Sequence, residues 1–296
     1  MKNFSFIKTR KIWYALTLIL MIGGAIGMLT AGLNLGIDFT SGTLFWLEFS
    51  EPADPAGISA AIEVPETVGL NLGKGMVQRV GDNEFTLRVP SLDADSQQVV
   101  IDAVKAKYPT AVSHGIDQVD PRIGSELTKV AIESVIIASI GILIYIALRF
   151  EYRFAAVSVA TLIAGVLITI GVFVITRQEV NSAFIAGMLT LVGYCVNNTI
   201  IVFDRIRENL RSTKKEDLAG MTDRSIREML GRTVHTTITT LIGVLSLFIF
   251  GSATIRDFTL ALLSGLIIGV YLSLFVAGPL WYDWRRLQGE NKPKVK

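Results

Sequence analysis

Polar side chains recur inside two long apolar runs, where they are the residues best placed to do chemistry. In the run at residues 180–203 their spacing of three or four places them on one helical face: Thr190, Tyr194, Asn197 and Asn198. The run at residues 233–255 repeats the pattern with Thr233, Thr236, Thr237 and Thr240. Polar groups inside a membrane helix are costly, so both sets are candidates for function.

Two polar stripes on successive helices favour a hydrated seam or a hydrogen-bonded network between them. Three uses stay open: hydrogen bonds that hold the helices together, a transport pathway, or a ligand site. Arg232, just before the second run, either joins the seam or extends to the membrane interface. Cys195 is expected to be a small buried residue and His235 a structural one. The candidate seam consists of Tyr194, Asn197, Asn198, Thr199, Arg232, Thr236 and Thr237.

The composition places the chain among polytopic membrane proteins. Of its 296 residues, 51% are apolar and only 18% are charged, and the mean hydropathy is +0.50. Soluble domains usually carry about 25% charged residues. Disordered and collagen-like classes are excluded, and a single cysteine excludes an internal disulfide. Two distant histidines argue against a metal site, and no cofactor is expected.

Six runs of low charge are long enough to cross a membrane, which takes a helix of about 20 residues. A backbone amide finds no other partner in hydrocarbon, so each run is predicted to be a helix. The first run is too long for the apolar part of a signal peptide, so residues 1–37 are expected to include an uncleaved anchor. The predicted spans are residues 12–37, 130–148, 154–176, 180–203, 233–255 and 258–282.

Lysine and arginine in short loops set the orientation of the spans. With the N-terminus inside, 19 basic residues fall on the inner side, whereas the two short outer loops hold only Arg177 and Arg256. Both termini are therefore expected in the cytoplasm, with residues 283–296 as a tail. Residues 204–232 are expected to form a cytoplasmic loop whose residues 222–230 lie as an amphipathic helix on the inner membrane surface. The basic residues flank the membrane, so no nucleic-acid surface is expected.

The outer segment, residues 38–129, is long enough to fold by itself. It predicts the order strand, helix, strand, strand, helix, strand, which is typical of the ferredoxin-like fold. These elements are residues 43–49, 55–63, 76–80, 84–89, 95–108 and 112–119. The predicted fold class is a polytopic α-helical membrane protein of six helices with an outer α+β domain between the first two. No nucleophile elbow, phosphate-binding loop or spaced acid pair is visible, so no enzyme is expected.

Glycine pairs spaced four residues apart indicate where helices can approach closely. They are Gly23 with Gly27 in the first span and Gly265 with Gly269 in the sixth. Both patterns are weak, because glycine is common in membrane helices.

Four motifs follow in order along the chain: LGIDFTSGT (35–43), VDPRIGSEL (119–127), GYCVNNTIIVFDRIREN (193–209) and RTVHTTITTL (232–241). They resemble L-G-I-D-F-T-G-G-T, V-G-P-x-I-G-x-E-L, G-Y-S-x-N-D-T-V-V-V-F-D-R-I-R-E-N and R-T-x-x-T-S-x-T-T-L of the SecF family. The likeness covers essentially the whole chain, and the third motif is highly specific.

The resemblance implies an accessory subunit of bacterial protein export in the inner membrane, built as an RND-like half transporter. Such a subunit pairs with SecD and works beside the SecYEG channel and the ATPase SecA, with YajC or YidC as further partners. Its outer domain would engage the emerging unfolded polypeptide, and protons passing through the lipid-embedded interface with SecD would drive late translocation. The pathway acid of the family falls on Asn198 and its pathway arginine on Arg232.

Two positions depart from the motifs. Ser41 stands where the family has glycine, and Asn198 stands where it has aspartate. A carboxyl group could bind and release a proton at position 198, whereas an amide cannot titrate. Two explanations stay open: an engineered Asp→Asn variant that freezes one state, which we favour, or a homologue that relies on an acid in its partner.

The implied mechanism needs the outer domain to move as a unit on two tethers. Bending is predicted at the first tether, where Gly36, Asp38, Ser41 and Gly42 lie. Asp120-Pro121 forms a stiffer second tether. An alternative function is half of an RND-type small-molecule exporter. Such pumps carry two large outer domains and twelve spans, whereas this sequence predicts one domain and six spans.

Overall fold

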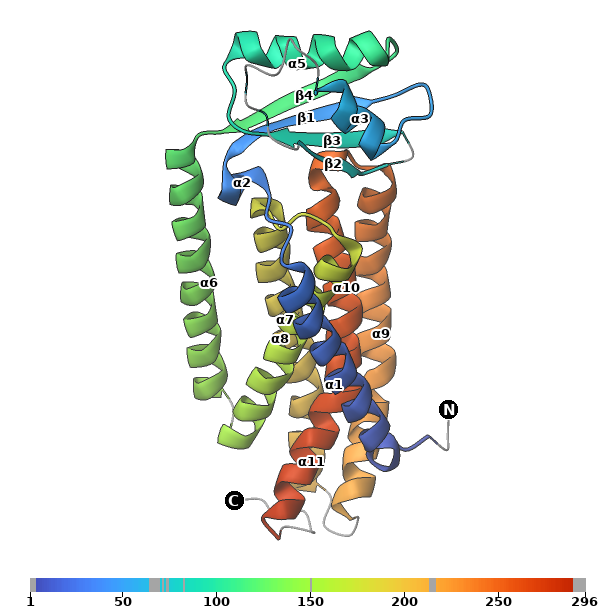
Figure 1. The fold of residues 1–296 in the computed structure, drawn as a ribbon. Helices are drawn as coiled ribbons and strands as arrows, with labels where there is room; N and C mark the ends of the chain where they lie inside the picture. The colour runs from blue at the N-terminus through green and yellow to red at the C-terminus, as the bar shows by residue number, and fades with distance from the viewer. Residues whose placement is uncertain are drawn as a thin grey trace. The chain divides into compact units, whose positions relative to one another are not determined.

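The chain folds into two compact units in the computed structural model, which describes residues 4–63, 70, 72, 75–81, 83–149, 151–212 and 217–289. The α+β unit is Leu35–Ile132, and the helical unit consists of Met1–Asn34 and Glu133–Lys296. Both parts of the predicted fold class are present, the α+β domain and the long apolar helices (Figure 1). Residues 213–216 of the predicted loop and 290–296 of the predicted tail lie outside the described residues.

Four strands of the α+β unit form an antiparallel sheet in the order β2-β3-β1-β4. Strand β1 (Gly42–Glu48) lies between β3 (Glu84–Val89) and β4 (Val112–Val119). Strand β2 (Met76–Arg79) pairs with the other side of β3. β-Formers fill the central strand, where alternate side chains face the core. The order and connections are those of the ferredoxin-like fold, as predicted.

Helices α3 (Pro55–Ala61) and α5 (Ala94–Lys107) contact each other and close the core of this unit. Apolar residues at helical spacing give α5 one buried face, which includes Val104. Val104 packs in one cluster with Phe45 of β1 and Leu87 of β3, and all three are almost fully buried. The unit therefore has a hydrophobic core of its own.

The predicted first tether contains one helical turn, α2 (Ile37–Thr40), closed by Ser41 N donating to Ile37 O at 2.7 Å. Ser41 and Gly42 follow with φ angles of 63° and 128°. With a ψ of 168°, Ser41 occupies a backbone region that is essentially restricted to glycine. Bending at this tether stays a prediction, while the strain lies at the position where the motif has glycine.

Replacing Ser41 by glycine is expected to stabilise the α+β unit by about 1 kcal/mol, because glycine adopts this backbone conformation without steric cost. Gly42→Ala is the matched control of opposite sign, since a Cβ there would lie 2.6 Å from Val89 O. Hydrogen exchange of the β1 amides in the full chain measures both changes. Unchanged exchange in Ser41→Gly would contradict the strain.

Six helices among the described residues are long and apolar enough to cross a membrane. The last of them is continuous from α10 (Arg256–Tyr271) through the π-helical η2 (Leu272–Ala277) to α11 (Gly278–Leu287), preceded by the short η1 (Ala253–Ile255). The other five are α1 (Phe6–Ala31), α6 (Pro121–Arg149), α7 (Tyr152–Thr176), α8 (Ser182–Ser212) and α9 (Leu218–Phe250).

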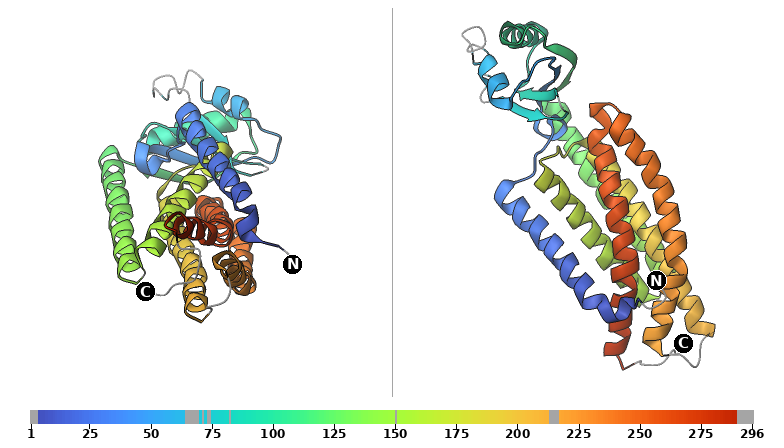
Figure 2. Two further views of the ribbon diagram at one scale, coloured as in Figure 1. Left: turned by 90° about the horizontal axis from the view of Figure 1, so that it is seen from below. Right: turned by 90° about the vertical axis from the view of Figure 1, so that its right-hand side faces the viewer.

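Helix α8 is packed against α7, α9 and α10, and the four run side by side (Figures 1 and 2). Gly265 of α10 receives the side chain of Leu191, and Gly269 lies against Cys195. Helix α1 approaches α7 through Gly24, which lies against Gly171. Close contact at Gly265 and Gly269 agrees with the sequence prediction. In α1, Gly27 lies against Val174 of α7 as predicted, whereas Gly24 makes the second contact in place of the predicted Gly23.

The first predicted span differs from its helix at the C-terminal end, and the second differs from its helix at the N-terminal end. Span 12–37 ends early as a helix, because α1 stops at Ala31 and Gly32 follows with a φ of 69°. Lack of charge makes a segment tolerant of hydrocarbon, but a glycine in this conformation ends the helix. Helix α6 instead begins nine residues before residue 130, at Pro121, a favoured first helical residue.

Residues 222–230 are helical with one buried face, as predicted, but they do not form a separate helix on the membrane surface. These residues are the first turns of α9, and Asp217 caps it by accepting from Gly220 N at 3.1 Å. Ile226 is fully buried in a cluster with Ile206 of α8 and Trp281 of α11. The apolar face that the sequence assigned to lipid contacts two other helices instead.

Candidate functional site

A side-chain hydrogen bond fixes the register of the antiparallel helices α8 and α9. Tyr194 OH and Thr240 Oγ1 lie 3.0 Å apart. Both helices rise about 1.5 Å per residue. Asn198 lies one turn after Tyr194 in α8, and Thr236 lies one turn before Thr240 in α9. Asn198 is therefore level with Thr236 and with its neighbour Thr237. The fold brings together the two polar stripes that the sequence identified.

Asn197 and Asn198 face different surroundings, because adjacent residues lie about 100° apart around a helix. Asn198 has only 2% of its surface exposed, whereas Asn197 is exposed. The single face suggested by the spacing is thereby divided into two sets. The buried polar cluster is Asn198, Thr199, Thr233 and Thr237. The exposed polar face is Thr190, Asn197, Arg232 and Thr236.

Three atoms of the buried polar cluster have no hydrogen-bond partner among the described residues: Asn198 Nδ2, Thr233 Oγ1 and Thr237 Oγ1. By contrast, Thr236 of the exposed face donates to Arg232 O at 2.9 Å. An unsatisfied buried polar group costs about 1–3 kcal/mol. The cluster therefore holds donors that could serve a carboxylate at position 198, a water molecule or another small polar ligand.

The exposed polar face adjoins glycines that leave room for another helix. At Gly193 of α8 and Gly243 of α9, an added Cβ would meet no side chain or neighbouring segment of the described chain within 4 Å. Gly193 and Asn197 lie one turn apart and so share a face of α8. Small and polar side chains on otherwise apolar helices match a second protein helix better than lipid.

The end of the third motif joins α8 to the beginning of α9. Asn209 Nδ2 donates to Ser225 Oγ and to Glu228 Oε2, both at 2.9 Å. Arg205 Nε donates to the same carboxylate at 2.5 Å. Asn209 and Ser225 are buried, so this network holds α8 and α9 in register near the C-terminal end of α8 and the N-terminal end of α9. The motif thus has a structural part as well as a candidate functional part.

Sequence reasoning missed the small hydroxyl residues of the third and sixth spans. Ser158 of α7 and Ser273 of η2 are 3% and 0% exposed. The rings of Phe154 and Phe203 lie 4.9 Å apart, which places Ser158 level with Thr199 of α8. The only signal was a serine inside an apolar run. That signal is weak, because serine hydroxyls in helices usually bond to their own backbone.

Three other chemically versatile residues are not members of the buried polar cluster, although Cys195 lies one helical turn from Asn198 and Thr199 on the buried side of α8. Cys195 is buried against Gly269, whereas His235 is exposed on α9. His114 contacts Glu48 within the α+β unit. Across the part of the chain that the structure describes, no three His, Cys, Asp or Glu side chains gather where they could hold a metal ion.

The fold and the polar cluster define the class: a six-helix membrane protein with a ferredoxin-like domain inserted after its first helix. Residues 99–287 match the family described as protein export membrane protein SecD/SecF, C-terminal, and residues 26–53 match the SecD/SecF GG motif. The chain belongs to the SecD/SecF family of protein-export membrane proteins. It is an accessory subunit of Sec protein export.

Proteins named protein translocase subunit SecF are similar to this chain along nearly its whole length. The one from Magnetococcus marinus is 39% identical over 287 residues, covering 94% of this chain and 91% of the relative. The one from Sebaldella termitidis is 35% identical over 286 residues, covering 96% and 93%. The chain is also 35% identical to protein translocase subunit SecDF of Bacillus subtilis, but spans only 38% of its length.

Two solved structures of SecDF resemble the fold. The translocon-associated membrane protein SecDF from Thermus thermophilus matches 96% of this chain with a TM-score of 0.87 at 30% identity. A second structure, SecDF in a super-membrane-facing form, matches 97% with a TM-score of 0.69 at 31% identity. This chain spans 39% of each SecDF chain.

Proposed function

We propose that this chain pairs with SecD in a bacterial inner membrane and couples proton movement to late steps of polypeptide translocation. It acts as a transport subunit and not as an enzyme. The polypeptide would pass through SecYEG after SecA has begun its transfer, and YajC or YidC would complete the assembly. Membership of the SecD/SecF family favours a polypeptide over a small molecule as the cargo.

The exposed polar face of α8 and α9 carries this proposal. Asn197, Arg232 and Thr236 are exposed on helices that are apolar enough to span a membrane. Hydrocarbon offers no hydrogen-bond partner to the side chains of Asn197 and Arg232. A second set of membrane helices would cover them and enclose a polar path beside the buried polar cluster. SecD supplies the candidate partner, because a relative named SecDF carries a segment like this chain within a longer protein.

The charge distribution supports the proposed orientation. The predicted inner segments hold 19 basic residues and the two short outer loops hold two. This bias favours both termini in the cytoplasm. The α+β unit would then lie on the outer side, where an emerging polypeptide could bind it.

Tryptophan at Gly193 is expected to abolish co-purification with SecD, because the indole would stand where the partner helix packs. Gly23→Trp is the matched control: Gly23 is also an exposed glycine with no neighbouring atom among the described residues within 4 Å of an added Cβ, but it lies on α1, away from the polar face. Affinity purification of each full-length variant with co-expressed SecD measures the association. Equal recovery of SecD with both variants would exclude this face as the interface.

A further inference from the structure

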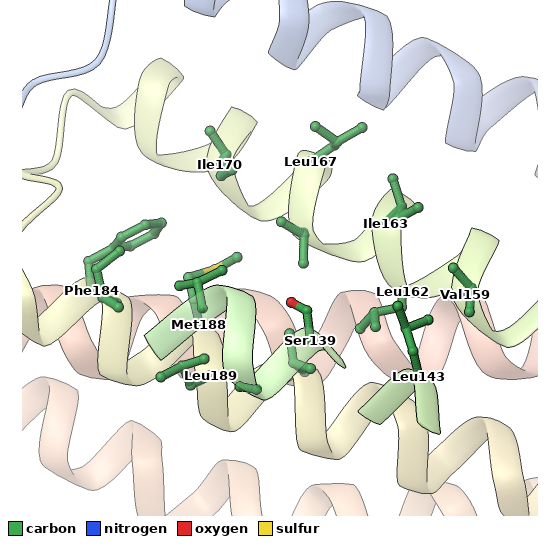
Figure 3. Close-up of a pocket in the computed structure, with 15 residues that line it drawn as sticks. Ser139, Leu143, Val159, Leu162, Ile163, Leu167, Ile170, Phe184, Met188 and Leu189 are labelled. Atoms are coloured by element: carbon green, nitrogen blue, oxygen red, sulfur yellow. The ribbon is translucent and has the colours of Figure 1, made fainter. Parts of the chain in front are cut away.

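A deep apolar groove lies between α6, α7 and α8, on residues that the proton path does not use (Figure 3). Its volume is about 430 Å³. Every lining side chain is apolar except Ser139 of α6. Such a lining offers a peptide backbone or a polar solute a single hydroxyl group. The chemistry of the groove therefore selects a hydrocarbon ligand.

The groove has a buried floor and an exposed rim. Phe184 and Met188 of α8 form the floor and are 3% and 7% exposed. Ile163 of α7 and Leu143 of α6 stand at the rim and are 52% and 42% exposed. Of residues 133–149 in α6, only Ile146 is buried. The groove is thus open along one side of the helical unit.

The length of the groove suits an acyl chain. Its lining along α7 runs from Val159 to Ile170, which is about 16 Å at 1.5 Å per residue. One leaflet contributes about half of the roughly 30 Å hydrocarbon layer. The groove is centred within α7 (Tyr152–Thr176), so a chain anchored at one membrane surface would enter one end of the groove and reach its midpoint near the middle of the membrane.

The charges at one end of the groove match a zwitterionic headgroup. Arg149 lies six residues after Leu143 of α6, and Arg153 lies six residues before Val159 of α7. At 1.5 Å per residue, each arginine is about 9 Å from the end of the groove. Arg149 has Asp204 at 3.7 Å, and Arg153 has Glu151 at 3.9 Å. Two cations beside two carboxylates complement a phosphate joined to an ammonium group.

From this geometry we propose that the groove binds an acyl chain of phosphatidylethanolamine. The phosphate lies at Arg149 and Arg153, and the ammonium group lies at Asp204 and Glu151. The bound chain fills the space between α6 and the rest of the helical unit. It thereby supports a helix that contributes few buried side chains of its own.

A helix of a partner protein is the competing occupant. With its side chains, a helix is about 10–12 Å across. To admit one, α6 would have to move away from α7 and break the contact of Ile146 with the apolar cluster that contains Phe154. An acyl chain needs no such movement.

Native mass spectrometry tests this assignment on the full chain purified in mild detergent and supplied with phosphatidylethanolamine or phosphatidylglycerol. Ala138→Trp fills the groove, while Ile137→Trp adds the same ring on the adjacent residue, which is 70% exposed outside the groove. Retention of phosphatidylethanolamine should fall about tenfold in Ala138→Trp and stay unchanged in Ile137→Trp, since losing a few buried methylenes accounts for such a factor. Val166→Trp fills the groove from α7, so it provides an independent test if Ala138→Trp does not fold.

Four further results decide the identity of the occupant. Phosphatidylethanolamine with lauroyl chains should be retained less than phosphatidylethanolamine with palmitoyl chains. Phosphatidylglycerol should be retained less than phosphatidylethanolamine. Equal retention in the groove variants and the control would overturn the proposal. So would loss of the lipid when SecD is co-expressed, because a partner helix would then fill the groove.

Discussion

Restoring a carboxyl group by Asn198→Asp is expected to raise proton flux through the pair with SecD by about a hundredfold. A positioned titratable group contributes about 10²–10⁴-fold to a proton-transfer step, and an amide contributes no proton. Aspartate has almost the same shape as asparagine, so the buried site can hold it without repacking. The hydroxyls of Thr233 and Thr237, which have no hydrogen-bond partner within the described part of the chain, lie on the facing helix, where they could donate to the ionised form.

Proteoliposomes that contain the chain and SecD, with a pH-sensitive dye inside, measure the flux after a proton gradient is imposed. Asn197→Asp is the matched control, because it adds the same carboxyl group one residue away on the exposed polar face. A smaller gain is expected there. Equal flux in all three proteins would contradict the assignment of position 198.

The unmodified chain distinguishes the two explanations for Asn198. If the amide freezes one state, the pair with SecD should conduct few protons until aspartate is restored. If an acid of SecD carries the proton, the pair should conduct without any change in this chain. Adding Thr237→Val to Asn198→Asp should lower the gain in the first case and have little effect in the second.

Features with a local cause could be predicted from the sequence. Membrane spans follow from long runs of low charge, and six helices were found among the described residues, as expected. The ferredoxin-like order follows from strand and helix periods within residues 38–129. Boundaries were less predictable. A charge-free run continues past Ala31, but the helix does not, because Gly32 turns the backbone.

The division of the polar seam could not be predicted, because it depends on which helices surround α8. Spacing places Asn197 and Asn198 near each other on the helix surface but does not say which side faces inward. Packing against α7, α9 and α10 buries Asn198 and leaves Asn197 exposed. The burial of Ile226 has the same origin, since its partners lie on α8 and α11. Tertiary contacts determine which of these side chains are buried, and the spacing of residues in one sequence does not reveal those contacts.

Gly265→Ala is expected to destabilise the helical unit by about 1–3 kcal/mol, the usual cost of overpacking a core. An added Cβ would lie 1.8 Å from Cδ1 and 2.9 Å from Cβ of Leu191. Leu191 is 1% exposed, so its side chain has no free space into which it could turn. At Gly243 of α9, by contrast, an added Cβ would meet no neighbouring atom of the described chain within 4 Å. Gly243→Ala, on the exposed side of α9, is the matched control and should be neutral or slightly stabilising.

A second substitution separates this steric clash from a general intolerance of change in α10. Leu191→Ala alone should cost about 2–5 kcal/mol, because it leaves a cavity. Combined with Gly265→Ala it removes the clash, so the double variant should be more stable than the sum of the two single effects. Thermal unfolding of the full chain in detergent measures all four proteins. Strictly additive effects would mean that α8 and α10 do not meet at this contact.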